Sequence, residues 1–126
     1  MGARPKRRKG FLYLTTTGRT SGEPHEIEIW YVERSGRFYL ISELRERAHW
    51  VRNLVREPRV SVAVEERSFD ARARVLDEAR NAARLRAVRA DFDRHYDWSD
   101  GLVVEIAPEA RPRRARPKGR AARGAS

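Results

Sequence analysis

The sequence predicts a mainly β (α+β) domain, a six-stranded antiparallel barrel with two or more interposed helices. Short stretches in which apolar and polar residues alternate recur along the chain, and polar turns of hairpin length join them in pairs. Two further stretches repeat their apolar residues every three or four positions, which is the spacing of one helix face. Because the chain lacks the strand–helix–strand rhythm of a parallel sheet, a doubly wound fold is disfavoured.

The first expected strand, residues 11–17, runs into a polar loop bounded by Gly18 and Gly22. Glycines can adopt positive φ and let an anion approach the backbone closely, and the guanidinium of Arg19 supplies a planar set of hydrogen-bond donors. The residues alone leave two interpretations open. The segment is either a phosphate-binding loop or a hairpin turn that carries a solvated arginine.

A second strand follows from the alternation over residues 25–31, and a third from the alternation over residues 37–42. The turn-forming residues 34–36 join these two strands as a hairpin. Residues 43–57 then change to helical spacing, and we expect them to form a helix that ends before Pro58.

The second half of the chain repeats this order of a hairpin and a helix. Residues 60–64 and 69–75 alternate on either side of a short polar turn and predict a second hairpin. Asp77 is the expected N-cap of a helix that runs to about residue 94. Residues 101–107 return as the last strand.

Composition limits the class of protein. With 126 residues, of which 40% are hydrophobic, the chain is expected to form one domain around one modest core. The absence of cysteine removes disulfides, thiolate metal sites and cysteine nucleophiles. No apolar stretch of signal-peptide or membrane-spanning length follows the charged N-terminus, because residues 15–20 interrupt the short apolar run before them. The sequence therefore predicts a cytoplasmic protein.

The positive charge lies at the two ends of the chain. Residues 1–10 carry +5 and residues 109–126 carry +6, which leaves −1 for residues 11–108 out of the total of +10. We expect a basic N-terminal arm, a folded domain and a disordered basic tail over these three ranges. The ends would either contact nucleic acid or an anionic membrane surface, which would make the protein membrane-peripheral, or only aid solubility.

Three segments carry a resemblance to a known family. They are TTTGRTSG at residues 15–22, HEIEIW at residues 25–30 and HWVRNLVREPRVSV at residues 49–62. Their combination resembles the deazaflavin-dependent nitroreductase family, which belongs to the split β-barrel, FMN-binding superfamily, over residues 12–107. The resemblance implies a split barrel, often a homodimer, that binds coenzyme F-420 (F420) in a groove beside the barrel.

The chemistry implied by this resemblance is hydride transfer to a small-molecule electron acceptor. The acceptor would be a quinone, a nitro compound or an activated alkene. FMN is the alternative coenzyme, because the same superfamily includes pyridoxamine phosphate oxidase-like proteins. In either case the protein would hold the coenzyme against the acceptor.

The resemblance also implies positions for the coenzyme. Its phosphate and acidic tail would lie on the loop residues Arg19, Thr20 and Ser21, which agrees with the anion-binding interpretation of that loop. The remaining coenzyme-binding positions lie on the second strand, the end of the third strand and the helix after it: His25, Ile27, Ile29, Trp30, Ile41, Ser42, His49, Trp50, Val51, Arg52 and Asn53. Helical spacing places four polar residues on one side of that helix, as a wall of the cleft: His49, Arg52, Asn53 and Arg56.

Tyr96 is the candidate catalytic residue. The family tends to place a substrate-facing tyrosine at this point, and the phenol would donate a hydrogen bond to the acceptor, with Trp98 closing the same pocket. Tyr96 also continues the apolar stripe of Leu85, Val88 and Phe92 by a further four positions. This spacing favours a packing role for the ring over a catalytic one.

Other chemistries find little support in the sequence. The three histidines show no metal-ligand spacing, so no metal site is expected. Neither Ser21 nor Ser42 has the sequence context of a hydrolase nucleophile. The competing hypothesis is a non-catalytic, degenerate barrel that has lost the coenzyme and binds nucleic acid or an anionic membrane through its basic ends.

Overall fold

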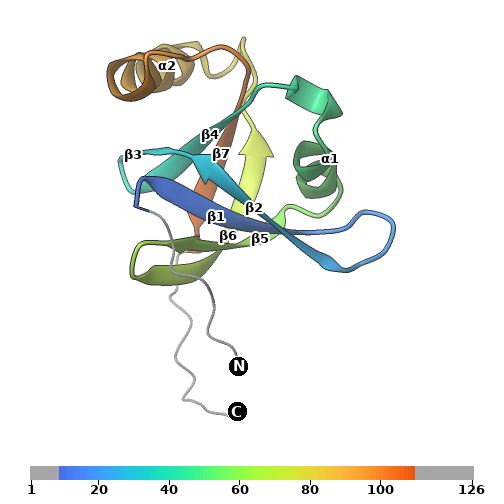
Figure 1. Cartoon of the computed structure of the whole chain (residues 1–126). Coiled ribbons are helices and arrows are strands. Elements are labelled where there is room, and N and C mark those ends of the chain that lie inside the picture. The colour runs from blue at the N-terminus through green and yellow to red at the C-terminus, as the bar shows by residue number, and fades with distance from the viewer. Residues whose placement is uncertain (1–8, 110–126) are drawn as a thin grey trace.

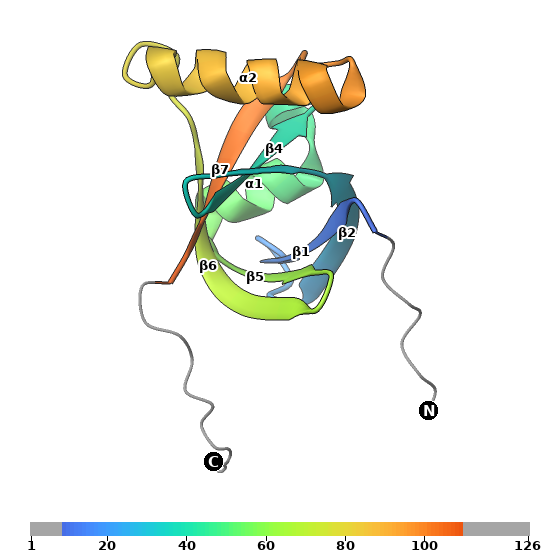
Figure 2. The ribbon, with the colours of Figure 1, turned by 90° about the vertical axis from the view of Figure 1, so that its left-hand side faces the viewer.

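A computed structural model describes residues 9–109 as a curled antiparallel sheet with helices packed against it (Figure 1). In chain order the elements are β1 Phe11–Thr17, β2 Pro24–Trp30, β3 Val32–Arg34, β4 Arg37–Ser42, the 3-10 helix η1 Arg45–Arg47, α1 His49–Arg56, β5 Arg59–Val64, β6 Arg67–Val75, α2 Ala82–Tyr96 and β7 Leu102–Pro108. The strand order is β2-β1-β5-β6-β7-β4-β3, and each neighbouring pair is antiparallel. Figure 2 shows the curl that makes the sheet a half-barrel.

The predicted mainly β antiparallel barrel with helices is confirmed, but the sheet has seven strands and not six. The extra strand arises because Tyr31 interrupts the expected second strand and separates β2 from β3. The Tyr31 N–H donates to the Tyr96 hydroxyl at 3.3 Å, and the same hydroxyl donates to the Tyr31 carbonyl at 2.6 Å. A side chain from α2 thus takes the main-chain hydrogen bonds of Tyr31.

The helix expected over residues 43–57 is divided. η1 and α1 are separated by Ala48, whose backbone is extended at φ −65° and ψ 137°. The end of α1 agrees with the prediction, because Glu57 is extended before Pro58 and the proline disfavours a helical conformation at the preceding residue.

The second helix begins later than predicted. Asp77 Oδ1 accepts hydrogen bonds from the main-chain N–H groups of Ala79 at 2.8 Å and Arg80 at 3.1 Å, so Asp77 caps a turn that precedes the helix. α2 itself starts after Asn81 and ends before Asp97, which has a positive φ of 56°. Asp77 therefore caps the turn before α2 and not the N-terminus of α2 itself.

The inner face of the sheet and α1 form one hydrophobic core. In β1, Leu12 and Leu14 are fully buried and Thr16 is 1% exposed, whereas the residues between them are only half-buried. α1 adds Val51 and Leu54 to this core from one side of the half-barrel. The inward row of β1 therefore leads from the core to a buried polar residue at the α1 end of the strand.

α2 covers the outer face of the sheet and makes a second core. Its members come from β3, β4, β7, α2 and the segment after β6: Val32, Tyr39, Ile41, Leu76, Leu85, Val88, Phe92 and Val103. The Arg34 guanidinium also donates to Asp91 at 2.8 Å, which ties α2 to β3. This hydrogen bond lowers the pKa of Asp91 and raises that of Arg34. Figure 2 shows α2 lying across the upper side of the curled sheet.

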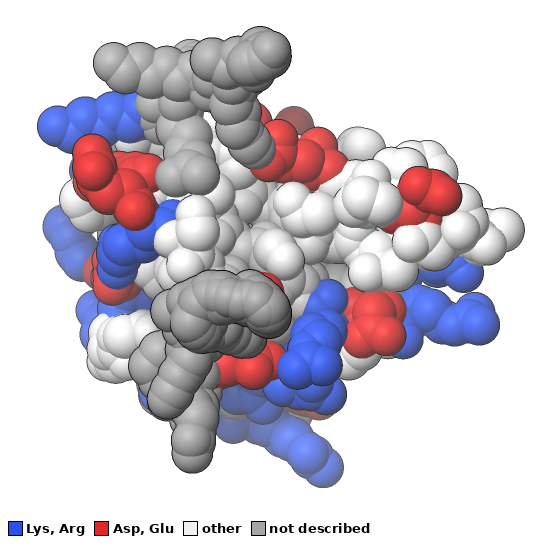
Figure 3. Space-filling view, turned by 90° about the horizontal axis from the view of Figure 1, so that it is seen from below, with Lys and Arg blue, Asp and Glu red and all other residues white. Residues whose placement is uncertain are grey.

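Charged side chains of both signs lie side by side on the face seen from below (Figure 3). Apart from Lys9, Gly10 and Glu109, the predicted basic arm and disordered basic tail fall outside the described residues. Their contacts with nucleic acid or membrane, and homodimer formation, stay predictions. Within residues 9–109, no helix has the length and apolar composition needed to cross a membrane.

Candidate functional site

A cleft of about 450 Å³ lies between the β1–β2 loop and the first turns of α1. β1 and β2 pair from Phe11 opposite Trp30 to Thr17 opposite Pro24, so the loop of residues 18–23 projects beyond the sheet beside α1 (Figure 1). The cleft is lined by Thr16, Gly18, Arg19, Thr20, Ser21, His25, Glu26, Ile27, His49, Trp50 and Asn53.

Two glycines shape the loop. Gly22 has a φ of +78°, and its N–H donates to the Gly18 carbonyl at 2.8 Å. A Cβ added to Gly18 would lie 2.6 Å from Ser21 Oγ and 2.9 Å from His25 Nε2. Glycine at these positions therefore permits the positive φ and allows the Ser21 and His25 side chains to lie against the backbone.

Asn53 holds Arg19 in place from the floor of the cleft. Its Oδ1 accepts hydrogen bonds from the Arg19 main-chain N–H at 3.1 Å and from the Arg19 guanidinium at 2.8 Å. Its Nδ2 donates to Thr16 Oγ1 at 3.1 Å, and both Asn53 and Thr16 are buried. One buried amide therefore fixes both the backbone and the charged group of Arg19.

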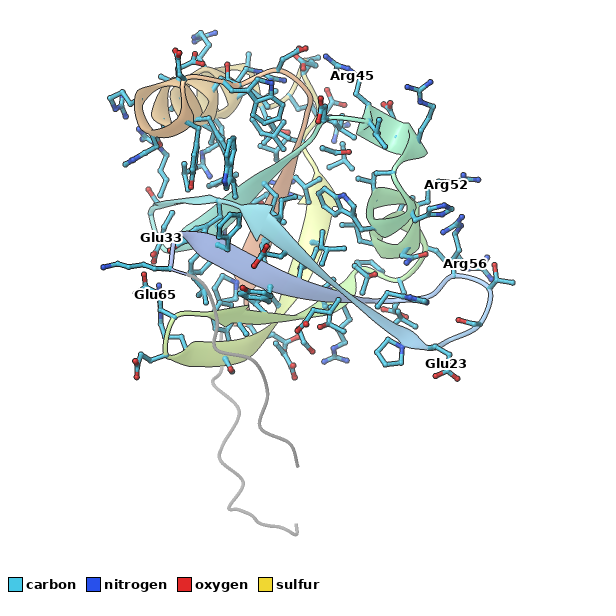
Figure 4. All side chains as sticks on the ribbon, viewed as in Figure 1. Glu23, Glu33, Arg45, Arg52, Arg56 and Glu65 are labelled. Atoms are coloured by element: carbon cyan, nitrogen blue, oxygen red, sulfur yellow. The ribbon has the colours of Figure 1, made fainter. Side chains whose placement is uncertain are left out.

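The positive charge at the cleft is reinforced from α1. The second arm of the Arg19 guanidinium lies 3.2 Å from His49 Nδ1. Because a guanidinium only donates, a hydrogen bond in this contact has Nδ1 of His49 as its acceptor. Arg52 and Arg56 project from α1 on the side of the β1–β2 loop (Figure 4). Glu26 is the one carboxylate among the described lining residues.

The structure brings eight of the predicted coenzyme-binding residues together in this cleft: Arg19, Thr20, Ser21, His25, Ile27, His49, Trp50 and Asn53. Arg52 is exposed and lies outside the lining. Three further predicted residues are buried elsewhere. Ile41 belongs to the core beneath α2, Val51 belongs to the inner core, and the Ser42 hydroxyl donates to the Arg45 carbonyl at 2.9 Å.

The last two predicted coenzyme-binding residues, Ile29 and Trp30, line a second pocket of about 520 Å³. The other lining residues are Phe11, Glu28, Glu43 and Trp98. β2 connects the two cavities, because residues 25–27 line the first and residues 28–30 line the second. Consecutive segments of the edge strand β2 therefore line both cavities.

Tyr96 lies behind the second pocket and does not line either cavity. Its ring stacks on Trp30 with centroids 4.5 Å apart, and its hydroxyl donates to the Tyr31 carbonyl. Burial raises the pKa of the Tyr96 phenol, and the hydrogen bond with Tyr31 offsets only part of this effect. The phenol is therefore protonated at neutral pH, and its role as a donor to an acceptor stays a prediction.

Sequence reasoning missed several residues that line the two cavities. Thr16 could have been found from its place in the inward row of β1, after Leu12 and Leu14. Glu28 and Glu43 carried no signal of a shared pocket, because they are far apart in sequence, one on β2 and the other in the turn after β4. Within residues 9–109, no group of three or more His, Asp or Glu side chains is placed to hold a metal ion.

Solved structures with the same fold include an F420-dependent reductase, a heme storage protein and a conserved hypothetical protein. An F420-H2 dependent reductase, FDR-A, is 26% identical, with a TM-score of 0.57 over 83% of this chain and 99% of the other. HutZ, the heme storage protein from Vibrio cholerae, is 18% identical, with a TM-score of 0.66 over 82% of this chain and 84% of the other. The conserved hypothetical protein Rv2991 from Mycobacterium tuberculosis is 21% identical, with a TM-score of 0.65 over 84% and 76% of the two chains.

Sequence comparison identifies the family. No significant match was found among curated protein sequences. Residues 2–104 match the family model of the F420H(2)-dependent quinone reductases, and this range includes β1, β2 and α1, which form the cleft around Arg19. The expected resemblance to deazaflavin-dependent reductases of the split-barrel superfamily is confirmed. The chain belongs to the F420H(2)-dependent quinone reductase family, a family of oxidoreductases.

Proposed function

We propose that this protein is an F420H2-dependent reductase that transfers a hydride to a quinone, and that the cleft beside the β1–β2 loop holds the coenzyme. The observation that carries the proposal is the fixed guanidinium of Arg19, which buried Asn53 holds by two hydrogen bonds in a cleft lined by hydroxyl groups. A preorganised arginine gains affinity for an anion because little conformational entropy is lost on binding.

The donor set of the cleft fits an anionic coenzyme with a flat ring. Arg19, Thr20 and Ser21 would hold a phosphate or carboxylate group. Ile27 and Trp50 offer apolar and aromatic surface on which a ring system could lie. Figure 4 shows Arg52 and Arg56 on the same side as the loop, where they would attract an acidic tail.

When bound, F420H2 supplies a hydride, and a quinone that takes up this hydride and one proton becomes a hydroquinone. The residues of this chain bind and orient the reactants. β2 would set their relative positions, since it lines the coenzyme cleft with residues 25–27 and the neighbouring aromatic pocket with residues 28–30. The acceptor would therefore enter from the side of Trp30.

The direct test is oxidation of F420H2 by a soluble quinone, followed by the absorbance of the oxidised deazaflavin. We expect turnover with F420H2 and, with reduced FMN, no acceleration over the uncatalysed reaction; a nitro compound and an activated alkene should be included as other acceptors. Arg19→Ala should lower kcat/KM by about tenfold or more, since hydrogen bonds to charged groups contribute about 1.5–3 kcal/mol. The control is Arg86→Ala, an exposed α2 arginine outside both cavities. Turnover with FMN alone would assign the protein to the oxidase-like relatives, and turnover with neither would favour a non-catalytic barrel.

Tyr96→Phe separates the two interpretations of Tyr96. The substitution keeps the ring on Trp30 and removes the hydroxyl that bonds the Tyr31 main chain. We expect a loss of about 1 kcal/mol in the free energy of unfolding and less than about a fivefold change in kcat. A loss of kcat of about 100-fold or more with unchanged KM would instead identify the phenol as the proton donor.

A further inference from the structure

A group of arginine side chains lies on the outer face of the sheet, away from both cavities. Its members, the arginine cluster, are Arg37 at the start of β4, Arg72 and Arg74 on β6, and Arg84 on α2. On β6, Ala71 and Ala73 belong to the inner core, so the residues that alternate with them point outward. No member of the cluster lines the coenzyme cleft or the pocket beside Trp30.

Three of these guanidinium groups converge on the buried carboxylate of Glu105. Arg74 donates from Nε to Oε1 at 2.8 Å, Arg37 Nη1 lies 3.4 Å from the same oxygen, and Arg84 Nη1 lies 3.3 Å from Oε2. The Tyr39 hydroxyl also donates to Oε2 at 2.8 Å, so each carboxylate oxygen has a short hydrogen bond even without Arg37 and Arg84. The burial of Glu105 therefore does not account for the whole cluster.

Arg72 extends the cluster along β6. It is exposed, and within residues 9–109 its side chain has no hydrogen-bond or ion-pair partner. It lies on the same face as Arg74 and about 7 Å from it along the strand. In the β5–β6 ladder it stands opposite Arg59, and like charges directly opposite each other destabilise a sheet. The fold thus places a further positive charge beside Arg74 without a contact that stabilises it.

The carboxylates around the cluster do not balance its charge. Four arginines share the one carboxylate of Glu105. Asp70 is the next outward residue of β6 on the far side of Arg72, and if it is counted as well, two positive charges stay in excess. Residues 1–8 and 110–126 contain no Asp or Glu, so they add no acidic side chain to this face. A bound anion would relieve the repulsion among the guanidinium groups.

The remaining hydrogen-bond donors suit phosphoryl groups. In the part of the chain that the structure describes, Arg74 donates only from Nε and Arg84 only from Nη1. Their other N–H groups are available on side chains that are 58% and 40% exposed. A guanidinium binds phosphoryl oxygens through pairs of parallel hydrogen bonds, and anchoring at Glu105 reduces the entropy that these arginines lose on binding.

We propose that the arginine cluster binds a small soluble molecule that carries two or more linked phosphoryl groups. One phosphoryl group would contact the arginines held at Glu105, and the next would reach Arg72. Binding of nucleic acid would require positive charges that follow a strand along a groove, whereas these guanidinium groups converge on one carboxylate. The inference does not depend on the proposed function, since the cluster is separate from the coenzyme cleft.

Binding is measured by calorimetric titration with inorganic pyrophosphate. Every protein is full-length and carries Arg19→Ala, which removes the fixed arginine of the coenzyme cleft. In this background we expect Arg72→Gln to weaken pyrophosphate binding by about threefold or more and Arg74→Gln by about fivefold or more. Because Arg72 has no described partner, its substitution should leave the midpoint of thermal unfolding unchanged. A loss of affinity in this variant therefore reports the loss of a ligand contact.

Two further variants test the sign and the place of the effect. Glu105→Gln removes the negative charge from the cluster and should tighten pyrophosphate binding by about twofold or more. The matched control is Arg86→Gln, an exposed arginine of α2 outside the cluster, which should leave the affinity unchanged. Equal affinities of Arg72→Gln and Arg86→Gln would overturn the inference, because binding would then depend on overall charge or on another part of the chain.

Two more ligands identify the class of molecule. Pyrophosphate should bind more tightly than orthophosphate by about threefold or more, and Arg72→Gln should remove most of this difference. A single-stranded oligonucleotide should bind the Arg72→Gln and Arg86→Gln proteins equally. If Arg72→Gln weakens the oligonucleotide and not pyrophosphate, the cluster is a nucleic-acid contact and the assignment to a small phosphorylated molecule is wrong.

Discussion

Glu105→Ala is expected to lower the free energy of unfolding by about 3–5 kcal/mol, a large part of the stability of a small domain. Glu105 lies on β7 and is 2% exposed beneath α2. Its two oxygens accept from the Arg74 guanidinium at 2.8 Å and from the Tyr39 hydroxyl at 2.8 Å. Arg84 and Arg37 lie farther away, at 3.3 Å and 3.4 Å. Removal of this one carboxylate leaves three guanidinium groups and a buried phenol without their common partner.

Two further variants show how much of this loss comes from the charge of Glu105 and from its burial. Glu105→Gln keeps the shape and one acceptor oxygen, so it should destabilise less than alanine does. Asp100→Ala removes a carboxylate that is 85% exposed and paired with Arg45, and we expect a change of about 0–1 kcal/mol. Urea unfolding followed by circular dichroism measures all three. A loss below about 1 kcal/mol for Glu105→Ala would show that the buried network contributes little.

The same carboxylate predicts a pH dependence of stability. Burial alone would raise the pKa of Glu105, but the hydrogen bonds from Arg74 and Tyr39 and the nearby positive charges hold it below its ordinary value. A carboxyl whose pKa is lowered by folding stabilises the protein above its unfolded-state pKa, and this stabilisation is lost as the pH falls through the folded-state pKa. The wild-type protein should therefore lose stability as the pH falls below about 5, and Glu105→Gln should lose less over the same range. If the free energy of unfolding falls with pH in the same way for both proteins, the acid sensitivity comes from groups other than Glu105.

Asn53→Ala is expected to weaken F420 binding by about tenfold and to destabilise the fold by about 2–3 kcal/mol. Asn53 satisfies two donors of Arg19 and one oxygen of Thr16 from a position that is 4% exposed. Alanine would leave Arg19 free to adopt many rotamers, so the loss of preorganisation lowers affinity without removing the charge.

The conservative variant Asn53→Asp makes this prediction specific. Aspartate can still accept from Arg19, but its negative charge neutralises the guanidinium, so coenzyme affinity should fall at least as far as in the alanine variant. Asn81→Ala is the matched control, because the Asn81 side chain accepts a hydrogen bond from the Asp77 N–H at 3.0 Å, outside the cleft. It should cost about 1 kcal/mol of stability and leave F420 affinity unchanged. Unchanged F420 binding by Asn53→Ala would contradict a positioning role for the amide.

Local patterns predicted most of the fold because the elements are short and their turns carry strong signals. Alternation in β1 identifies the inward row of Leu12 and Leu14, and the turn at residues 34–36 joins two paired strands, β3 and β4. The expected hairpin partner of residues 37–42 was wrong, because residues 24–30 form β2, which pairs with β1. The break at Tyr31 could not be predicted, since it depends on hydrogen bonds with a tyrosine 65 positions away. Local sequence carries no record of such a contact.

The candidate site was predicted where it depends on one loop and one helix face. Arg19 and Asn53 come together because the β1–β2 loop lies beside α1. Ile41 and Ser42 were expected beside the coenzyme, but β4 is buried on both faces because α2 covers its outer side. Alternation identifies two faces of a strand and does not indicate what covers each of them.

The most direct measurement is a titration of the full-length protein with F420, followed by the fluorescence of the coenzyme, with Arg19→Ala and Arg86→Ala measured in parallel. We predict that the wild-type protein and Arg86→Ala bind F420 with the same Kd and that Arg19→Ala binds at least about tenfold more weakly. F420 binding that is unaffected by Arg19→Ala, or wild-type protein that binds FMN and not F420, would contradict the assignment of this cleft to the deazaflavin coenzyme.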